Sequence, residues 1–209
     1  AYLFSIFGVL ATFGIGNTTQ VNTIVTSIDT ALLNFNLVSK DSLETLNLLL
    51  GIGIAIITGM VLLGGIKRIG SVTEKLVPFM ALLYVILALG VIFTNITSIP
   101  KVFAMIFEGA FNPSAVTGGI VGSMFLSMKK GVSRGIFSNE AGLGSGSIAH
   151  ACADTDGPVK QGLFGIFEVF VATIVICTLT ALVVLCSGVH IEYGVDAGAE
   201  LTIAGFVST

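Results

Sequence analysis

The chain has 209 residues, of which 54% are hydrophobic and only 10% are charged, whereas soluble globular domains carry about 25% charged residues. Together with a mean hydropathy of +1.02, this composition excludes a water-soluble globule and indicates an integral membrane protein in a lipid bilayer. The 12 acidic and 9 basic residues give a formal net charge of -3 at pH 7. Because the basic residues do not gather on one face of any segment, nucleic acid is not expected as a partner.

The chain begins at Ala1, without a Met or a basic leader, inside a run that carries no charge before Asp29. A secretory signal peptide would open on a basic segment. This beginning therefore indicates an internal piece of a longer protein, and we expect that protein to continue at both ends.

Five runs without charged residues are long enough to cross a bilayer. A hydrocarbon core about 30 Å thick needs roughly 20 apolar residues at a helical rise of about 1.5 Å. The runs are 1–28, 45–66, 76–100, 109–128 and 169–191. We expect each to be a transmembrane α-helix, so that residues 1–209 form a single all-α transmembrane domain fragment.

Lysine and arginine alternate in number between these runs. Segment 67–75 contains three and segment 129–168 contains four, whereas 29–44 and 101–108 contain one each. The positive-inside rule then places the two richer segments in the cytoplasm. We expect a multi-pass protein of the cell inner (plasma) membrane of a prokaryote, with 129–168 as a cytoplasmic segment.

The cysteines and histidines predict neither a disulfide framework nor a metal site. Cys177 and Cys186 are nine residues apart on one expected helix, about 13 Å at the helical rise and too far for a disulfide. No CxxC or HExxH spacing occurs, and His150 and His190 fall in segments expected on opposite sides of the membrane. We expect free thiols, no bound metal or cofactor, and no enzymatic activity.

Two amide side chains stand out in the first run. Asn17 and Gln20 lie one helical turn apart beside a stripe of small and polar residues that advances by three and four positions. The stripe can be a packing seam between helices. An amide in hydrocarbon, however, needs several hydrogen-bond partners, which another helix or a ligand must supply. We predict that at least one of these two amides lines a solute-binding site.

The fourth run contains closely spaced glycines. Glycine in a helix interior costs about 1 kcal/mol, so Gly118, Gly119 and Gly122 indicate either a tight helix crossing or an unwound stretch. Unwound backbone at membrane depth lines a cavity or is buried in protein, and offers its polar groups to ions and zwitterions, as in secondary transporters. The candidate substrate-binding residues here are Gly118, Gly119, Gly122, Ser123, Phe125 and Ser127.

The segment between Arg134 and Lys160 is too rich in glycine and serine for one long helix. We expect residues 138–140 to cap a short helix, because short polar side chains and an acid satisfy a helix N-terminus. The alternating glycines lack the Lys-Ser/Thr of a phosphate-binding loop. We expect His150 to be a hydrogen-bonded structural residue rather than a proton relay, and Glu168 to pair with cytoplasmic bases.

Four stretches carry a distinctive pattern: GIFSNEAGLGS at 135–145, IAHA at 148–151, PVKQGL at 158–163 and GGIKRI at 64–69. They resemble the alanine/glycine:cation symporter family, the sodium:alanine symporters, and the similarity runs through nearly the whole chain. This resemblance implies a longer protein with a leucine-transporter-like fold of two inverted five-helix repeats, in which the present helices are core helices three to seven.

The resemblance also implies a function, namely sodium-coupled symport of small neutral amino acids such as alanine or glycine. The amino acid and the sodium ion would be the partners, with Gln20 facing the substrate, residues 122–128 bordering the pocket, and the sodium site mostly outside this chain. This sequence departs from the family pattern at two places. In the last run, it has Ala172 before Thr173, where family members commonly have Asp. In the segment 129–168, it has Gly146-Ser147, where family members commonly have Ala-Pro.

Two other functions stay open at this point. A proton-coupled amino acid carrier of the same fold is favoured if His150 or Glu168 titrates during transport. A channel would use backbone carbonyl groups of 118–122 as a filter, but the sequence has no short repeated filter motif and no ring of charges. A membrane-embedded enzyme would need a reactive pair inside a span, and the charge-free runs supply none.

The expected orientation can be tested with single cysteines in a cysteine-free full-length parent. Lys67→Cys and Ser147→Cys should be protected from an impermeant thiol reagent in intact cells, whereas Lys40→Cys should react, because only the last lies outside. Labelling of Ser147→Cys from outside contradicts this orientation.

Overall fold

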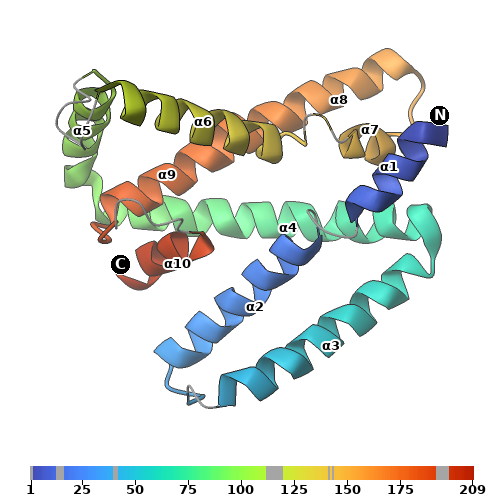
Figure 1. Cartoon of the computed structure of the whole chain (residues 1–209), viewed down its shortest axis with the longest axis horizontal. Helices are drawn as coiled ribbons and strands as arrows, with labels where there is room; N and C mark the ends of the chain where they lie inside the picture. The colour runs from blue at the N-terminus through green and yellow to red at the C-terminus, as the bar shows by residue number, and fades with distance from the viewer. Residues whose placement is uncertain are drawn as a thin grey trace. The chain divides into compact units, whose positions relative to one another are not determined.

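The structure, a computed structural model, describes residues 2–12, 17–39, 42–111, 120–140, 142, 144–191 and 198–209. Within these residues every regular element is a helix (Figure 1), which confirms the all-α prediction. The chain divides into two compact units. The first consists of Ala1–Ala81 with Ile191–Ala204, and the second of Leu82–His190 with Gly205–Thr209.

The first unit is built around a pair of packed helices. It contains α1 (Tyr2–Thr12), α2 (Asn17–Asn34), α3 (Leu43–Leu62), the start of α4 (Gly65–Thr94) and the start of α10 (Ala199–Val207). Within it, α2 and α3 pack against each other.

The second unit holds the remainder of α4 and of α10 together with the intervening helices. These are η2 (Ile96–Ser98), α5 (Ile99–Phe111), α6 (Ile120–Ser138), α7 (Ser145–His150), α8 (Pro158–Phe170), η4 (Val171–Ile176) and α9 (Cys177–Cys186). The segment η4 is π-helical, so α8, η4 and α9 form one continuous helix with a wider turn in its middle.

Three helices of the described chain are long and apolar enough to cross a membrane. They are Leu43–Leu62, Gly65–Thr94 and Pro158–Cys186, and they overlap the predicted runs 45–66, 76–100 and 169–191. The predicted runs 1–28 and 109–128 include residues 13–16 and 112–119, which lie outside the described residues. The count of five spans therefore stays a prediction, as does the single transmembrane domain.

Helix α4 begins earlier than the apolar run that predicts it. Its 30 residues reach about 45 Å, more than the roughly 30 Å of a hydrocarbon core. The basic residues Lys67, Arg68 and Lys75 therefore lie within the first part of helix α4 and not in a loop between two helices. Charge content predicts where a helix leaves the hydrocarbon, but it does not predict where the helix begins.

Large apolar side chains are exposed along the three long helices. Leu48, Ile52 and Ile56 of α3 and Leu82 and Ile86 of α4 are each at least half exposed. Soluble monomers rarely expose contiguous apolar surface on this scale. Surfaces of this kind are expected of helices that face lipid.

The small core of the second unit joins α4, α9 and α10. Ala88, Val91 and Val183 are buried, and the Tyr84 hydroxyl bonds to the hydroxyl of Thr180. The Tyr84 ring also meets the ring of Phe206 edge to face, with centroids 5.9 Å apart. Because lipid is as apolar as these side chains, close packing and the hydroxyl contact hold this core together.

The close approach of α10 to α9 depends on a glycine, which gives a test of this core. A Cβ at Gly205 would lie 3.1 Å from Val183 Cγ1 and 3.2 Å from Ser187 Oγ, whereas a Cβ at Gly90 meets nothing within 4 Å. Gly205→Leu should lower the stability of the full-length protein by about 1–3 kcal/mol, the usual cost of overpacking. Thermal unfolding in detergent measures this cost, with Gly90→Leu as the control. Equal losses in the two variants contradict the packing described for α9 and α10.

Candidate functional site

The predicted amides lie at the beginning of α2 in the first unit. Asn17 is the first residue of this helix and Gln20 lies one turn later, and both are exposed. Their spacing along one helical face agrees with the sequence interpretation. Their role toward a solute stays a prediction.

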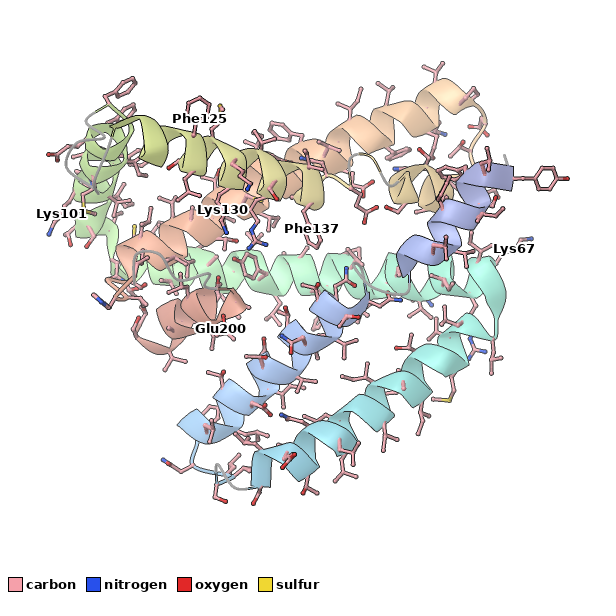
Figure 2. All side chains as sticks on the ribbon, in the orientation of Figure 1. Lys67, Lys101, Phe125, Lys130, Phe137 and Glu200 are labelled. Carbon is pink, nitrogen blue, oxygen red and sulfur yellow. The ribbon has the colours of Figure 1, made fainter. Side chains whose placement is uncertain are left out.

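The other predicted site residues belong to the second unit or lie outside the described residues. Gly118 and Gly119 lie outside them. The backbone is helical from Ile120 onward, so it is not unwound at Gly122 or at Ser123, whose side chain is not described. Figure 2 shows the ring of Phe125 projecting from α6, where it is 63% exposed, and Ser127 is also exposed. A pocket shared by these residues and Gln20 stays a prediction.

A cavity of about 570 Å³ lies in the second unit, where the end of α6 and α7 meet the helix formed by α8 and η4. Glycines and the apolar side chains of Ile166, Val169 and Ala172 form part of its wall. Its polar lining consists of Ser138, Asn139, Glu140, Ser147, His150 and Glu168. The sequence interpretation expected a helix cap at 138–140, a hydrogen-bonded His150 and a paired Glu168, with His150 or Glu168 titrating only in the proton-coupled alternative. It did not predict that these residues meet, because their convergence depends on the turns between three helices.

Asn139 connects the end of α6 to η4. Its Nδ2 atom donates a hydrogen bond to the Gly135 carbonyl of α6 at 3.0 Å. Its Oδ1 atom accepts a hydrogen bond from Thr173 Oγ1 at 2.9 Å. Both side chains are partly buried. The first bond fixes the orientation of the amide, and the second ties the two helices together.

His150 connects α7 to α8 through two hydrogen bonds. Gln161 Nε2 lies 2.5 Å from His150 Nδ1, and Glu168 Oε2 lies 3.1 Å from His150 Nε2. An amide nitrogen only donates, so Nδ1 accepts and the proton of a neutral ring sits on Nε2, which donates to the carboxylate. These bonds confirm that His150 is a hydrogen-bonded residue, and they show that a histidine is the base paired with Glu168.

The His150–Glu168 pair is partly open to solvent. The His150 side chain is 31% exposed and that of Glu168 is 68% exposed. Exposed pairs of this kind contribute about 0–1 kcal/mol. The pair therefore orients α7 on α8 more than it stabilises the fold.

The predicted cap of the short helix is wrong. The N-cap of α7 is Gly144, with φ of 71° and no side-chain cap, and not a residue of 138–140. Glu140 still reaches this helix, because Ser145 Oγ donates a hydrogen bond to Glu140 Oε2 at 2.5 Å. A left-handed glycine turns the chain into α7, and the turn brings Glu140 beside the first residue of the helix.

The polar lining of the cavity can bind a small solute through hydrogen bonds. In the described part of the chain no three His, Cys, Asp or Glu side chains group as metal ligands. Cys152, Cys177 and Cys186 are free, as predicted. The charged members of the lining are the carboxylates Glu140 and Glu168, beside hydroxyl and amide groups that can hydrogen-bond a small polar solute.

The left-handed glycine before α7 gives a test of this site. Gly144→Ala should destabilise α7 by about 1–2 kcal/mol, the cost of placing a Cβ in left-handed backbone. Gly146→Ala, inside α7 with no atom within 4 Å of its new Cβ, should be neutral or stabilising by up to about 1 kcal/mol. Thermal unfolding of the two variants of the full-length protein measures the difference. Equal stability contradicts the turn described here.

Comparison with known proteins shows transporters as relatives. The chain is 43% identical to the sodium/alanine symporter AgcS of Methanococcus maripaludis over 205 residues. The matched region covers 97% of this chain and 42% of the symporter. It is 37% identical over 183 residues to the amino-acid carrier protein AlsT of Bacillus subtilis (86% of this chain, 36% of the relative). It is 40% identical over 141 residues to a sodium/proton-dependent alanine carrier protein of a Bacillus species, a match that covers 68% of this chain and 31% of the relative.

The chain thus spans less than half the length of these relatives. They are transporters and not enzymes, which confirms the exclusion of an enzyme made from the sequence. The model of the sodium:alanine symporter family matches residues 1–209, and the chain belongs to that family.

Proposed function

We propose that the protein containing this chain is a secondary active transporter that couples the inward movement of sodium to that of a small neutral amino acid, alanine or glycine. The observation that carries this proposal is the family match over all of residues 1–209. The three helices long and apolar enough to cross a membrane support it as well. The sodium ion is a substrate of this reaction, and its ligands lie mostly in parts of the protein beyond this chain.

The proposed architecture is a leucine-transporter-like bundle in the plasma membrane, to which this chain contributes core helices three to seven. Segments 67–75 and 129–168 face the cytoplasm in this arrangement. Transport then proceeds by alternating access, in which helices rearrange around a solute site near the middle of the membrane.

From the sequence, Asn17 and Gln20 of α2 are proposed as substrate-binding residues, and so, separately, are residues of α6. A neutral amide can bond to both the ammonium and the carboxylate of a zwitterion without adding net charge. Phe125 lies three residues after Gly122 on α6, on a neighbouring part of the helix surface, whereas Ser127 lies five residues after Gly122, on a different face. These groups suit a small amino acid with little side chain of its own.

A proton-coupled carrier is the second candidate, and a specific observation favours it. His150 Nε2 and Glu168 Oε2, the two groups that such a carrier would use, lie 3.1 Å apart at the edge of the cavity. The alanine carrier of the Bacillus species is named as sodium- and proton-dependent.

Uptake of labelled alanine by the full-length protein in vesicles tests both candidates. Sodium, lithium and proton gradients are imposed separately, with protein-free vesicles as the control. The proposal expects saturable uptake that depends on the sodium gradient. Uptake with a proton gradient alone favours the second candidate, and uptake that does not saturate indicates a channel.

Gln20 gives the sharpest test of the proposed site. Gln20→Ala should lose about 1–3 kcal/mol of alanine binding, tenfold or more in affinity, because the ligand's polar groups lose their partner. Gln20→Leu should be equally damaging if hydrogen bonding is the reason, and nearly harmless if Gln20 only fills a packing seam. Alanine binding and surface expression are measured for both variants. Unchanged affinity with normal expression removes Gln20 from the site.

A further inference from the structure

Hydroxyl groups on the helices of this chain have two kinds of hydrogen-bond partner. Most bond back to a carbonyl group of their own helix, three or four residues earlier. These are the hydroxyls of Thr23, Ser27, Thr30, Thr73, Thr94 and Thr180. Thr173 differs, because its hydroxyl donates to Asn139 Oδ1, which lies 34 residues earlier at the end of another helix.

The backbone around Thr173 is also unusual. Thr173 lies within η4, the π-helical turn inside the helix that runs from Pro158 to Cys186. π-Helical turns are rare and occur frequently at functional sites. The hydroxyl that leaves its own helix therefore lies where that helix departs from regular α geometry.

The partner of Thr173 is oriented to receive it. Because Asn139 Nδ2 donates to the Gly135 carbonyl, the amide oxygen faces η4. The neighbouring Ser138 Oγ lies 4.0 Å from Cys177 Sγ, on the same side. Two successive residues at the end of α6 thus approach the π-helical turn and the residue that follows it.

Helix α6 has few other attachments in the second unit. Its side chains Phe125, Leu126, Met128, Val132 and Ile136 are each at least half exposed. Among the described residues α6 packs chiefly against η4. Within the described residues, the contact at Asn139 and Thr173 therefore helps to fix where the end of α6 lies.

We infer that Asn139 and Thr173 are positioning residues of the transport cycle, whose hydrogen bond forms and breaks as α6 moves against η4. The inference rests on the proposed function, in which α6 carries residues that border the substrate. With the bond formed, the end of α6 is held beside the cavity. With the bond broken, α6 and η4 separate at this end of the carrier. One neutral hydrogen bond shifts such an equilibrium by about fivefold, which biases the two states without locking either.

Cross-linking tests whether the two residues must separate. Asn139→Cys and Thr173→Cys are combined in a full-length parent from which Cys152, Cys177, Cys186 and any other cysteines have been removed. A short bifunctional methanethiosulfonate reagent should join the two thiols and block alanine uptake, and a reducing agent should restore uptake. Mass spectrometry of the peptides detects the cross-link whether or not the protein transports alanine. A failure of the proposed function is seen separately, as absence of alanine uptake by the untreated parent.

The matched control joins two positions on a single helix. Gly135→Cys with Asn139→Cys keeps one of the two substitutions and places the second thiol one turn away on α6, where a Cβ meets no atom within 4 Å. Cross-linking this pair should leave uptake unchanged. Full uptake with 139 joined to 173 overturns the inference, and so does failure of these two thiols to join.

Single variants provide a second measurement that does not depend on cross-linking. Thr173→Val keeps the shape of the side chain and removes the hydroxyl. It should therefore change either the KM for alanine or the maximal rate of uptake by about fivefold, and the other parameter by less. Thr173→Ser should restore the parental values. Thr180→Val, which loses the bond to Tyr84, should lower protein stability and leave KM unchanged. The same behaviour in Thr173→Val and Thr180→Val overturns the inference, because it indicates a structural role only.

Discussion

In the hydrocarbon core of a bilayer no water is available to a free backbone N–H or C=O group, so each apolar segment must satisfy its own hydrogen bonds. Helix formation meets this requirement for the backbone, and the hydroxyls of residues such as Thr23, Thr94 and Thr180 meet it locally by bonding to carbonyl groups of their own helices. Polar contacts between helices are therefore few among the described residues. Each one fixes the position of one helix against another, which apolar packing alone fixes only weakly. In the second unit such a contact joins Tyr84 to Thr180. Where the predicted cytoplasmic segment meets the helix from Pro158 to Cys186, polar contacts join Asn139 to Thr173 and His150 to its two partners on α8.

The same constraint explains how much of the fold the sequence predicts. A long apolar run has to be helical, so α3 and the apolar part of α4 follow directly from runs 45–66 and 76–100. The beginning of α4 does not follow, because a helix can continue beyond the membrane surface into residues such as Lys67 and Arg68, and nothing in the local sequence requires it to stop. The π-helical turn at 171–176 is also invisible to hydropathy, since it changes the hydrogen-bond pattern of a helix without changing its apolar character.

The candidate site was predictable only as far as single residue types allow. A histidine in a polar segment was expected to be hydrogen-bonded, and His150 is. Its partners Gln161 and Glu168 were not identified, because the turn between α7 and α8 decides which helical face meets the ring. Likewise, the pattern at 138–140 predicts a helix cap, but the left-handed Gly144 is the N-cap of α7. Asn139 instead accepts a hydrogen bond from Thr173, which lies 34 residues later in the chain, where no local pattern could predict it. The substrate role of Gln20 depends on how distant helices assemble, which no local pattern specifies.

The contact at the end of α6 is a hydrogen bond between two uncharged side chains, and this sets the free energy that is needed to break it. The family resemblance implies an acid before the threonine, whereas this chain has Ala172, a small side chain in the cavity wall. A charge at that position, in a medium of low dielectric constant, would interact strongly with any opposite charge and would be costly to leave unpaired. The amide–hydroxyl bond between Asn139 and Thr173 is neutral, with a net contribution of about 1 kcal/mol, and neither partner is left with an uncompensated charge when the helices separate. A neutral bond of this strength is therefore suited to the proposed contact that forms and breaks in every cycle.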